Sequence, residues 1–244
     1  MKTPGFTRGH FQLLPPGGIH VWGVAGESGS LRYTKPVKRR YFLFILYLLI
    51  FAASGHAADR QLLVCFGDSI TAGYGLPAGE AYPDFLQKKL DAQGYAYKVV
   101  NHGTSGATTK DALASVPFIV RMHPEVVIVE FGGNDGLRGL PLERTRANLD
   151  QVLAALEAAH IKILLAGITL PPDYGPDYIR TFNAIFPALA SKHHAELVPM
   201  IYKDLVHVPG TIQGDGIHPT AKGSEIIAGT LMPALKPLLR KGRE

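Results

Sequence analysis

The sequence predicts an α/β fold in which a parallel sheet is covered by helices on both faces. From residue 61 onward, strand-like and helix-like segments alternate along the chain, and this order is typical of a parallel sheet. The segment 125–131 (EVVIVEF) is rich in β-branched residues, which indicates a strand buried on both faces. Polar and glycine-rich clusters follow the first three predicted strands, at the sheet edge where ligands bind in such folds.

Five strands and five helices are expected in the body of the chain. Short apolar runs predict strands at 61–66, 97–101, 125–131, 161–168 and 196–200. Helices are expected at 81–93, 110–122, about 149–159, 179–194 and 221–239, and apolar residues at helical spacing mark the third of them. The sequence shows no internal repeat and no second domain. We therefore expect residues 58–244 to form a single domain.

The positive charge of the chain belongs to its first part. The 244 residues are 46% hydrophobic and carry a formal net charge of +5. Residues 1–57 contain seven of the 25 Lys and Arg residues but one of the 20 Asp and Glu residues, so residues 58–244 hold 18 basic and 19 acidic side chains. A nucleic-acid-binding domain is expected to be basic in its folded part. The charge pattern thus argues against a nucleic-acid partner.

Residues 1–57 are expected to be an N-terminal leader that contains a secretory signal peptide. Lys38-Arg39-Arg40 precedes an uncharged run of 13 residues, 41–53, and small residues stand at Gly55 and Ala57. This arrangement predicts cleavage after Ala57 and a periplasmic or secreted protein. A retained membrane anchor is the alternative, but the run is shorter than the ~20 apolar residues that span a bilayer. We expect no membrane span after cleavage.

The segment before the basic cluster is unusual for a signal peptide. Residues 1–36 are long, rich in Gly and Pro, and without clear periodicity. We hypothesise that translation starts further downstream, near residue 37.

Three residues in two distant segments have the chemistry of an acyl-transfer site. Ser69 directly follows the first predicted strand, and Asp215 and His218 share a loop before the last helix. A serine hydroxyl becomes a good nucleophile when a base takes its proton and a carboxylate orients that base. Taken alone, Ser69 could cap a turn, and the other two could form a hydrogen-bonded turn pair. Glycine-rich strand ends at 101–106 and 132–135 favour catalysis, although the G-x-S-x-G motif of α/β-hydrolases is absent.

Four sequence blocks, taken in order, resemble the GDSL/SGNH hydrolase family. They are FGDSITAGYGL at 66–76, NHGTSGATT at 101–109, GGNDGLRG at 132–139 and DGIHP at 215–219. The resemblance spans about residues 61–238. The stretch VEFGGNDGLRGLP is similar in particular to the bacterial periplasmic acyl-CoA thioesterase/lysophospholipase and arylesterase members. The resemblance implies a three-layer α/β/α sandwich with a flavodoxin-like, mostly parallel five-stranded sheet, the SGNH hydrolase fold.

The resemblance also implies a role for each motif residue. Ser69 would be the nucleophile, His218 the general base and then the general acid, and Asp215 the carboxylate that orients the imidazole. An oxyanion hole would stabilise the charge of a tetrahedral intermediate. Its donors would be the backbone N–H groups of Ser69 and Gly106 and the side-chain amide of Asn134.

The second block offers a choice of donor, because Gly103 is present beside Gly106. Gly106 is favoured, since the donor glycine of the family follows a serine. Asp68 is expected to fix the nucleophile turn by hydrogen bonding, and Asp135 to do the same for its own loop.

No cofactor and no metal are expected. His193 and His194 stand near a helix end and are interpreted as a solvated terminus rather than as metal ligands. No His/Cys/Asp cluster has metal-ligand spacing, and no phosphate-binding loop occurs. Hydrolysis through a serine nucleophile needs only water.

We expect a serine esterase that cleaves fatty acyl or aryl esters and thioesters, with a small-molecule substrate and a monomeric state. Apolar residues on the segments 136–142 and 170–178 would form an acyl-chain groove, with ordinary loop packing as the alternative. These residues are Leu137, Leu140, Leu142, Pro171, Pro172 and Tyr174. A carbohydrate O-acetyl esterase and a non-catalytic periplasmic binding protein are the competing hypotheses. The apolar loops argue against the first, and the presence of Ser69, Asp215 and His218 argues against the second.

Overall fold

The computed structural model describes residues 60–205 and 207–241. The predicted leader, its cleavage site and the hypothetical start near residue 37 therefore lie outside the described residues. Among the described helices, none combines the length and the apolar character needed to cross a membrane.

Five strands form one sheet, and every neighbouring pair is parallel, which confirms the predicted architecture. The strand order is β2-β1-β3-β4-β5, the order of flavodoxin-like folds. The apolar run of β3 is buried along its whole length, as its composition predicts. The strands are β1 (Gln61–Gly67), β2 (Tyr97–Gly103), β3 (Val126–Glu130), β4 (Lys162–Ala166) and β5 (Glu196–Val198).

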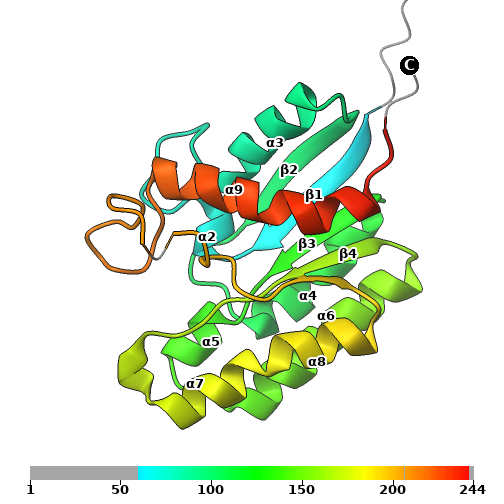
Figure 1. Cartoon of the computed structure of the whole chain (residues 1–244). Coiled ribbons are helices and arrows are strands. Elements are labelled where there is room, and N and C mark those ends of the chain that lie inside the picture. The colour runs from blue at the N-terminus through cyan, green and yellow to red at the C-terminus, as the bar shows by residue number, and fades with distance from the viewer. Residues whose placement is uncertain (1–59, 206, 242–244) are drawn as a thin grey trace, which may run out of the picture. The chain divides into compact units, whose positions relative to one another are not determined.

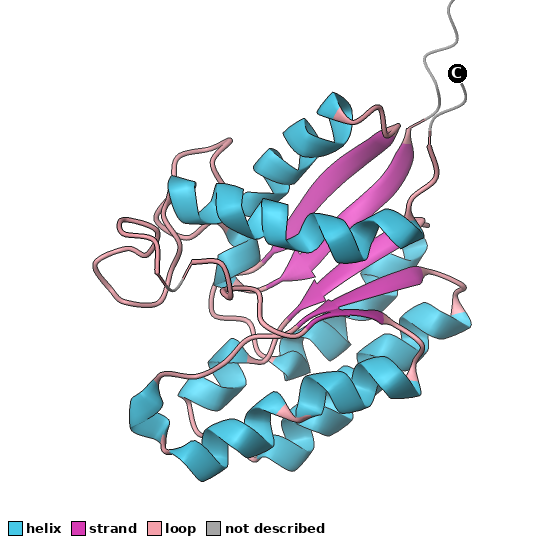
Figure 2. Ribbon diagram, viewed as in Figure 1, coloured by secondary structure: helices cyan, strands magenta, loops and turns pink. Residues whose placement is uncertain are grey.

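Helices cover both faces of the sheet (Figure 1; Figure 2). On one face, α3 (Tyr82–Ala92) packs against α9 (Ala221–Leu235). The other face is covered by α4 (Thr109–Arg121), α6 (Leu142–Ala158) and α8 (Ile185–Lys192). Large apolar side chains fill the space between the layers; the fully buried ones include Phe66, Tyr82, Phe131, Leu149, Phe182 and Phe186.

Some helix boundaries differ from the prediction. The helix expected at 179–194 is two helices, α7 (Pro176–Asn183) and α8, which meet at Ala184. Helix α6 begins at Leu142 rather than near residue 149, and Pro141 stands at its N-cap. Helix α9 ends at Leu235 and is followed by the 3₁₀ turn η2 (Lys236–Leu238), which contains a proline.

The predicted loops after β3 and β4 also contain short helical turns. These are α5 (Gly133–Leu137) and the 3₁₀ turn η1 (Pro172–Tyr174). A further short helix, α2 (Ser69–Ala72), follows β1 directly.

The first three strands end at the same level of the sheet. Gly67 of β1 is in register with Gly103 of β2 and with Glu130 of β3. The segments that follow them therefore leave the sheet side by side, at the edge where α2 and α5 lie (Figure 1). At the opposite edge, the backbone N–H of Arg240 donates to the hydroxyl of Tyr97, 3.0 Å away, which fastens the C-terminal segment to the start of β2.

Gly103 allows β2 to approach α2 closely. A Cβ atom at this position would lie 2.2 Å from the backbone nitrogen of Ala72, and backbone atoms cannot move aside as a flexible side chain can. We therefore predict that Gly103→Ala destabilises the fold by about 1–3 kcal/mol or more. Chemical denaturation of the purified variant measures the change.

Gly229 provides the matched control, because a Cβ there would have no atom within 4 Å and the residue lies inside α9. Gly229→Ala is expected to stabilise the protein by up to about 1 kcal/mol, since alanine is the better helix former. Equal effects of the two substitutions would contradict the close approach at Gly103.

Candidate active site

Ser69 is the first residue of α2, immediately after the end of β1. Asp68 caps this helix, because its Oδ1 accepts a hydrogen bond of 3.0 Å from the backbone N–H of Ile70. The expectation that Asp68 fixes the nucleophile turn is thus confirmed. The end of β1 and the cap of α2 thus place Ser69 at the carboxyl edge of the sheet.

The segment with Asp215 and His218 is tied back to α2. An antiparallel bridge joins Ile212 to Pro219, and the backbone N–H of Gln213 donates to the carbonyl of His218 at 2.7 Å. The side-chain amide of Gln213 donates to the carbonyl of Tyr74, also at 2.7 Å, just after α2. These contacts fix the loop relative to the serine, although about 145 residues of sequence separate them.

The structure brings Ser69, His218 and Asp215 together in one hydrogen-bonded chain. Nε2 of His218 lies 2.9 Å from Oγ of Ser69, and its Nδ1 lies 2.6 Å from Oδ2 of Asp215. Because a carboxylate can only accept, Nδ1 carries the hydrogen and Nε2 is free to accept the serine proton. This arrangement can generate a serine nucleophile.

Asp215 is held in its ionised form. Its bond to the His218 side chain, followed by bonds from the backbone N–H groups of His218 and Ile217 at 3.0 and 2.9 Å, lowers its pKa to about 2. The carboxylate therefore stays negative at neutral pH.

Two backbone N–H groups beside Ser69 are unoccupied. Within the described residues, neither the N–H of Ser69 nor that of Gly106 has a hydrogen-bond acceptor. The N–H of Gly103, the alternative donor, is already bonded to Oδ1 of Asn101 at 2.9 Å. Of the two glycines in the second block, Gly106 is therefore the one with an available donor.

The side-chain amide of Asn134 faces the same region from α5. Its Nδ2 donates to Oδ2 of Asp68 at 3.1 Å and to the carbonyl of Ala107 at 3.0 Å. Both amide hydrogens are thus used in the resting protein. Arg138 adds a bond of 2.9 Å to the carbonyl of Gly106 and so connects the second and third sequence blocks.

An apolar cavity of about 360 Å³ lies between α5 and the loop that carries Asp215 and His218. Gly133 and Leu137 line it on one side, and Gly216 and Ile217 line it on the other, next to the Asp215–His218 pair. The remaining lining residues come from the segments after β4 and β5: Ile168, Thr169, Leu170, Pro171, Pro172, Met200 and Tyr202.

The groove expected from the sequence is therefore present, with a partly different lining. Leu137, Pro171 and Pro172 line it, whereas Leu140 and Tyr174 are exposed and Leu142 lines another cavity. The hydroxyl of Tyr174 instead donates to the carbonyl of Leu137 at 2.7 Å and joins the two loops that border the groove.

Comparison with known proteins identifies the family of this chain. Residues 65–226 match the model of the GDSL-like lipase/acylhydrolase family. The chain belongs to this family.

The family relatives share most of their length with this chain. Esterase TesA of Pseudomonas aeruginosa is 40% identical over 183 residues, which are 75% of this chain and 91% of that protein. Thioesterase 1/protease 1/lysophospholipase L1 of Escherichia coli K12 is 37% identical over 201 residues, or 82% of this chain and 94% of that protein. A crystal structure of TesA, 40% identical, covers 73% of this chain and 100% of its own, with a TM-score of 0.71. The expected resemblance to GDSL/SGNH hydrolases is confirmed.

One of the expected structural roles in this GDSL-family chain uses an unexpected partner, and another is wrong. Asp135 ties its own loop to the start of α4, because its carboxylate accepts from the backbone N–H and hydroxyl of Thr109. His193 is not solvated but buried, because Asp150 and Glu157 of α6 lie 2.7 and 2.9 Å from its two ring nitrogens. In both cases the partner comes from a helix that is distant in sequence.

Sequence reasoning missed two further residues that shape the site. Arg138 donates the hydrogen bond to the carbonyl of Gly106. It could have been identified in the sequence because it is the single cation within the third block. Tyr202 lines the groove and donates to the carbonyl of Ile217 at 2.9 Å, which supports the loop beside His218. It lies in an irregular segment that shows no recognisable pattern in the sequence.

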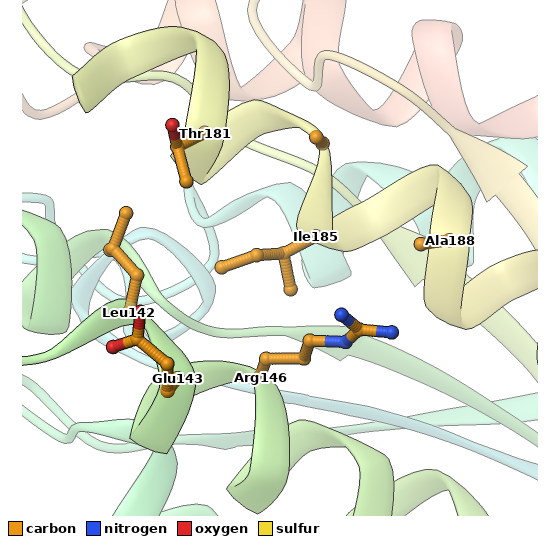
Figure 3. Close-up of a pocket in the computed structure, with 7 residues that line it drawn as sticks. Leu142, Glu143, Arg146, Thr181, Ile185 and Ala188 are labelled. Atoms are coloured by element: carbon orange, nitrogen blue, oxygen red, sulfur yellow. The ribbon is translucent and has the colours of Figure 1, made fainter. Parts of the chain in front are cut away.

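A second cavity, of about 290 Å³, lies between α6 and the α7–α8 pair (Figure 3). It is lined by Leu142, Ile185 and Ala188 together with the polar residues Glu143, Arg146 and Thr181. It shares no residue with the apolar groove between Leu137 and Ile217.

In the part of the chain that the structure describes, no group of three or more His, Cys, Asp or Glu side chains is arranged to hold a metal ion.

The depressed pKa of Asp215, about 2 against an ordinary value of 3.8, predicts a pH-dependent contribution to stability. The contribution is present above about pH 4 and is lost as the pH falls through about 2, because the folded state then has to bind a proton. In Asp215→Asn this contribution is absent. The difference in melting temperature between parent and variant should therefore shrink from pH 5 to pH 2.

Thermal melts at several pH values and at low salt test this expectation. The Asp215 side chain is 38% exposed, so salt should reduce the effect. A difference that stays constant over the whole range would show that the His218 bond does not hold the carboxylate ionised.

Proposed function

We propose that this chain is a serine esterase that hydrolyses carboxylic esters and thioesters through an acyl-enzyme. The observation that carries the proposal is the hydrogen-bonded chain Ser69–His218–Asp215 with two unoccupied N–H donors beside the serine. Membership of the GDSL-like lipase/acylhydrolase family and the names of the relatives, esterase and thioesterase/lysophospholipase, support the same reaction class.

In the first half-reaction, Oγ of Ser69 attacks the acyl carbonyl carbon while Nε2 of His218 takes the hydroxyl proton. The ionised Asp215 stabilises the imidazolium that forms. His218 then gives the proton to the leaving alcohol or thiol. In the second half-reaction, His218 takes a proton from water as the water oxygen attacks the acyl carbon. The bond between this carbon and Oγ of Ser69 then breaks, His218 returns the proton to Oγ, and the acid is released.

The negative oxygen of each tetrahedral intermediate is assigned to the N–H groups of Ser69 and Gly106. Asn134 supplies a third donor. Of its two amide hydrogens, the one that faces the neutral carbonyl of Ala107 is the one an oxyanion can take over, because an anionic acceptor forms the stronger hydrogen bond. Each donor of this kind contributes about 10²–10³ to the rate.

The acyl group is assigned to the apolar cavity between Leu137 and Ile217. A volume of about 360 Å³ and a lining without charged side chains suit an aliphatic or aryl chain rather than a sugar. This favours fatty acyl or aryl substrates over the O-acetyl groups of carbohydrates. We further propose that the enzyme acts as a monomer.

We also propose that the enzyme is exported, on the basis of the basic cluster, the apolar run and the small residues before Ala58 in the sequence. N-terminal sequencing of the protein recovered from the cell envelope and medium tests this. A mature N-terminus near Ala58 is expected. An N-terminus at or near residue 37, in the membrane fraction, would instead identify a retained anchor.

Ser69→Ala is predicted to lower kcat by roughly 10³-fold or more on nitrophenyl esters and palmitoyl-CoA, because it removes the atom that forms the acyl-enzyme. The fold should be unchanged, since the Ser69 hydroxyl contacts only His218 among the described residues. Steady-state kinetics and a melting curve measure both quantities.

Ser191→Ala is the matched control, because this serine is exposed on α8, away from the site. It should retain the parent kcat. Activity of Ser69→Ala within tenfold of the parent would eliminate Ser69 as the nucleophile.

Thr169→Trp is predicted to shorten the acyl range. Thr169 lines the groove and is half-buried, so the larger ring can fill the cavity without disturbing the core. We expect kcat/KM for palmitoyl esters to fall by at least about tenfold and that for acetyl esters to change less than about threefold.

Thr181→Trp in the second cavity is the control and should leave the chain-length profile unchanged (Figure 3). Equal losses on short and long esters in Thr169→Trp would place the acyl chain elsewhere. Activity of the parent on acetylated sugars alone would support the carbohydrate esterase instead.

A further inference from the structure

A carboxyl group that the proposed mechanism does not use is buried directly behind the nucleophile turn. Glu130 is the last residue of β3, and its exposed fraction is 0%. Its Oε2 accepts from the hydroxyl of Thr71 at 2.9 Å and lies 3.4 Å from the backbone N–H of Asp68. Its Oε1 has no hydrogen-bond partner among the described residues.

The second carboxyl in this place belongs to Asp68, which is 2% exposed. Its Oδ1 and Oδ2 accept from the backbone N–H of Ile70 and from the side-chain amide of Asn134. The two acids are buried next to each other, and two negative charges in a space closed to water repel, so one of the two groups is expected to keep its proton.

The other titratable groups around Glu130 add no positive charge at close range. Tyr82 of α3 bonds to the Thr71 hydroxyl at 3.1 Å, and Cys65 of β1 adjoins Tyr82. Tyr202 lies in the segment after β5, and burial, followed by the charges of Glu130 and Asp68, raises its pKa. His218 acts electrostatically to lower the pKa of Asp68. In the described part of the chain, no Lys or Arg forms an ion pair with Glu130 or Asp68, the two acids themselves.

Of the two acids, Glu130 has the surroundings that favour the neutral form more strongly. Burial, and then the neighbouring charge of Asp68, raises the pKa of Glu130 well above its ordinary value of 4.5. Burial also raises the pKa of Asp68, but the N–H of Ile70 and the amide of Asn134 oppose this and favour its charged form. Desolvation of an acid without a cation nearby favours the neutral form.

The space around this pair permits little movement. A Cβ on Gly67 would lie 2.0 Å from the Thr71 hydroxyl oxygen and 2.7 Å from Oε2 of Glu130. The absence of a side chain at Gly67 is what admits Glu130 beneath the turn. The acid is thus part of the packing that places Ser69.

We propose that Glu130 is a positioning residue that remains protonated at neutral pH and holds the nucleophile turn through its Oε2, which accepts from the hydroxyl of Thr71 and faces the backbone N–H of Asp68. This inference rests on the proposed serine esterase mechanism. Through Asp68, the contact fixes two elements of the site: the cap of α2, which aims Ser69, and the amide of Asn134. Ionisation of Glu130 would place two negative charges side by side in a buried space and separate these elements.

Two substitutions separate the hydrogen bond from the charge. Glu130→Gln keeps the shape and an acceptor oxygen for the Thr71 hydroxyl and cannot ionise, so kcat should stay within about threefold of the parent. Glu130→Leu removes donor and acceptor, and kcat should fall by about 10–100-fold with KM changed by less than threefold, because the acyl groove is untouched. Glu143→Gln, an exposed acid on α6, is the control and should match the parent.

The rate at which a fluorophosphonate modifies Ser69 provides a second kinetic readout. It should follow the same order, with Glu130→Leu slowest, because this reaction depends on the Ser69–His218 pair and not on the acyl chain. Equal rates for all three variants would overturn the positioning role.

A spectroscopic measurement tests the proton itself and does not depend on activity. Infrared spectra of the parent at neutral pH should contain the carbonyl stretch of a buried, protonated carboxylic acid, and Glu130→Gln should lose it. The melting temperature of the parent should fall more between pH 5 and pH 8 than that of Glu130→Gln. The reason is that the raised pKa makes the folded state retain a proton that the unfolded state releases, so stability is lost as the pH rises.

These measurements distinguish a failure of this proposal from a failure of the proposed esterase mechanism. Absence of the band, or identical pH dependence of the two melting temperatures, would overturn the proposal even if Glu130→Leu does not fold. If the band is present and Ser69→Ala keeps its activity, the proposed nucleophile fails while the proton on Glu130 stands.

Discussion

The whole site depends on three parallel strands that end at one level. Gly67, Gly103 and Glu130 are in register, so the segments after β1, β2 and β3 begin side by side. Ser69 follows β1, Gly106 follows β2 and Asn134 follows β3, and these are the residues that we propose for the reaction. A shift of one residue in either pairing would move the start of one of these segments relative to the other two. The hydrogen bonds of the sheet therefore determine the geometry of the chemistry.

Much of this could be predicted from the sequence. Alternating strand and helix patterns, and glycine-rich blocks at strand ends, predict the sheet and identify Ser69, Asp215 and His218. The buried acid Glu130 was missed, although it is the single charged residue at the end of an otherwise apolar strand. The burial of His193 was also missed, because its partners Asp150 and Glu157 lie about 40 residues away in sequence, on α6.

The resting site combines occupied and unoccupied hydrogen-bond groups in a consistent way. Asn134 is held by Asp68 and Ala107, and Gly106 is held through its carbonyl by Arg138. The N–H groups of Ser69 and Gly106, in contrast, have no protein acceptor among the described residues. The two backbone N–H groups are thus available to the oxyanion that we propose, whereas the amide hydrogens of Asn134 are occupied in the resting protein. Donors arranged in this way need little reorganisation during the reaction.

The bond between the Arg240 backbone and the Tyr97 hydroxyl has a practical consequence for handling the protein. It holds the C-terminal segment at the start of β2, and Arg60 at the start of β1 lies at the same edge. Both ends of the described domain are therefore on the side of the sheet opposite Ser69 (Figure 1). Coupling the domain to a bead or a fusion partner through either end leaves the serine facing the solution.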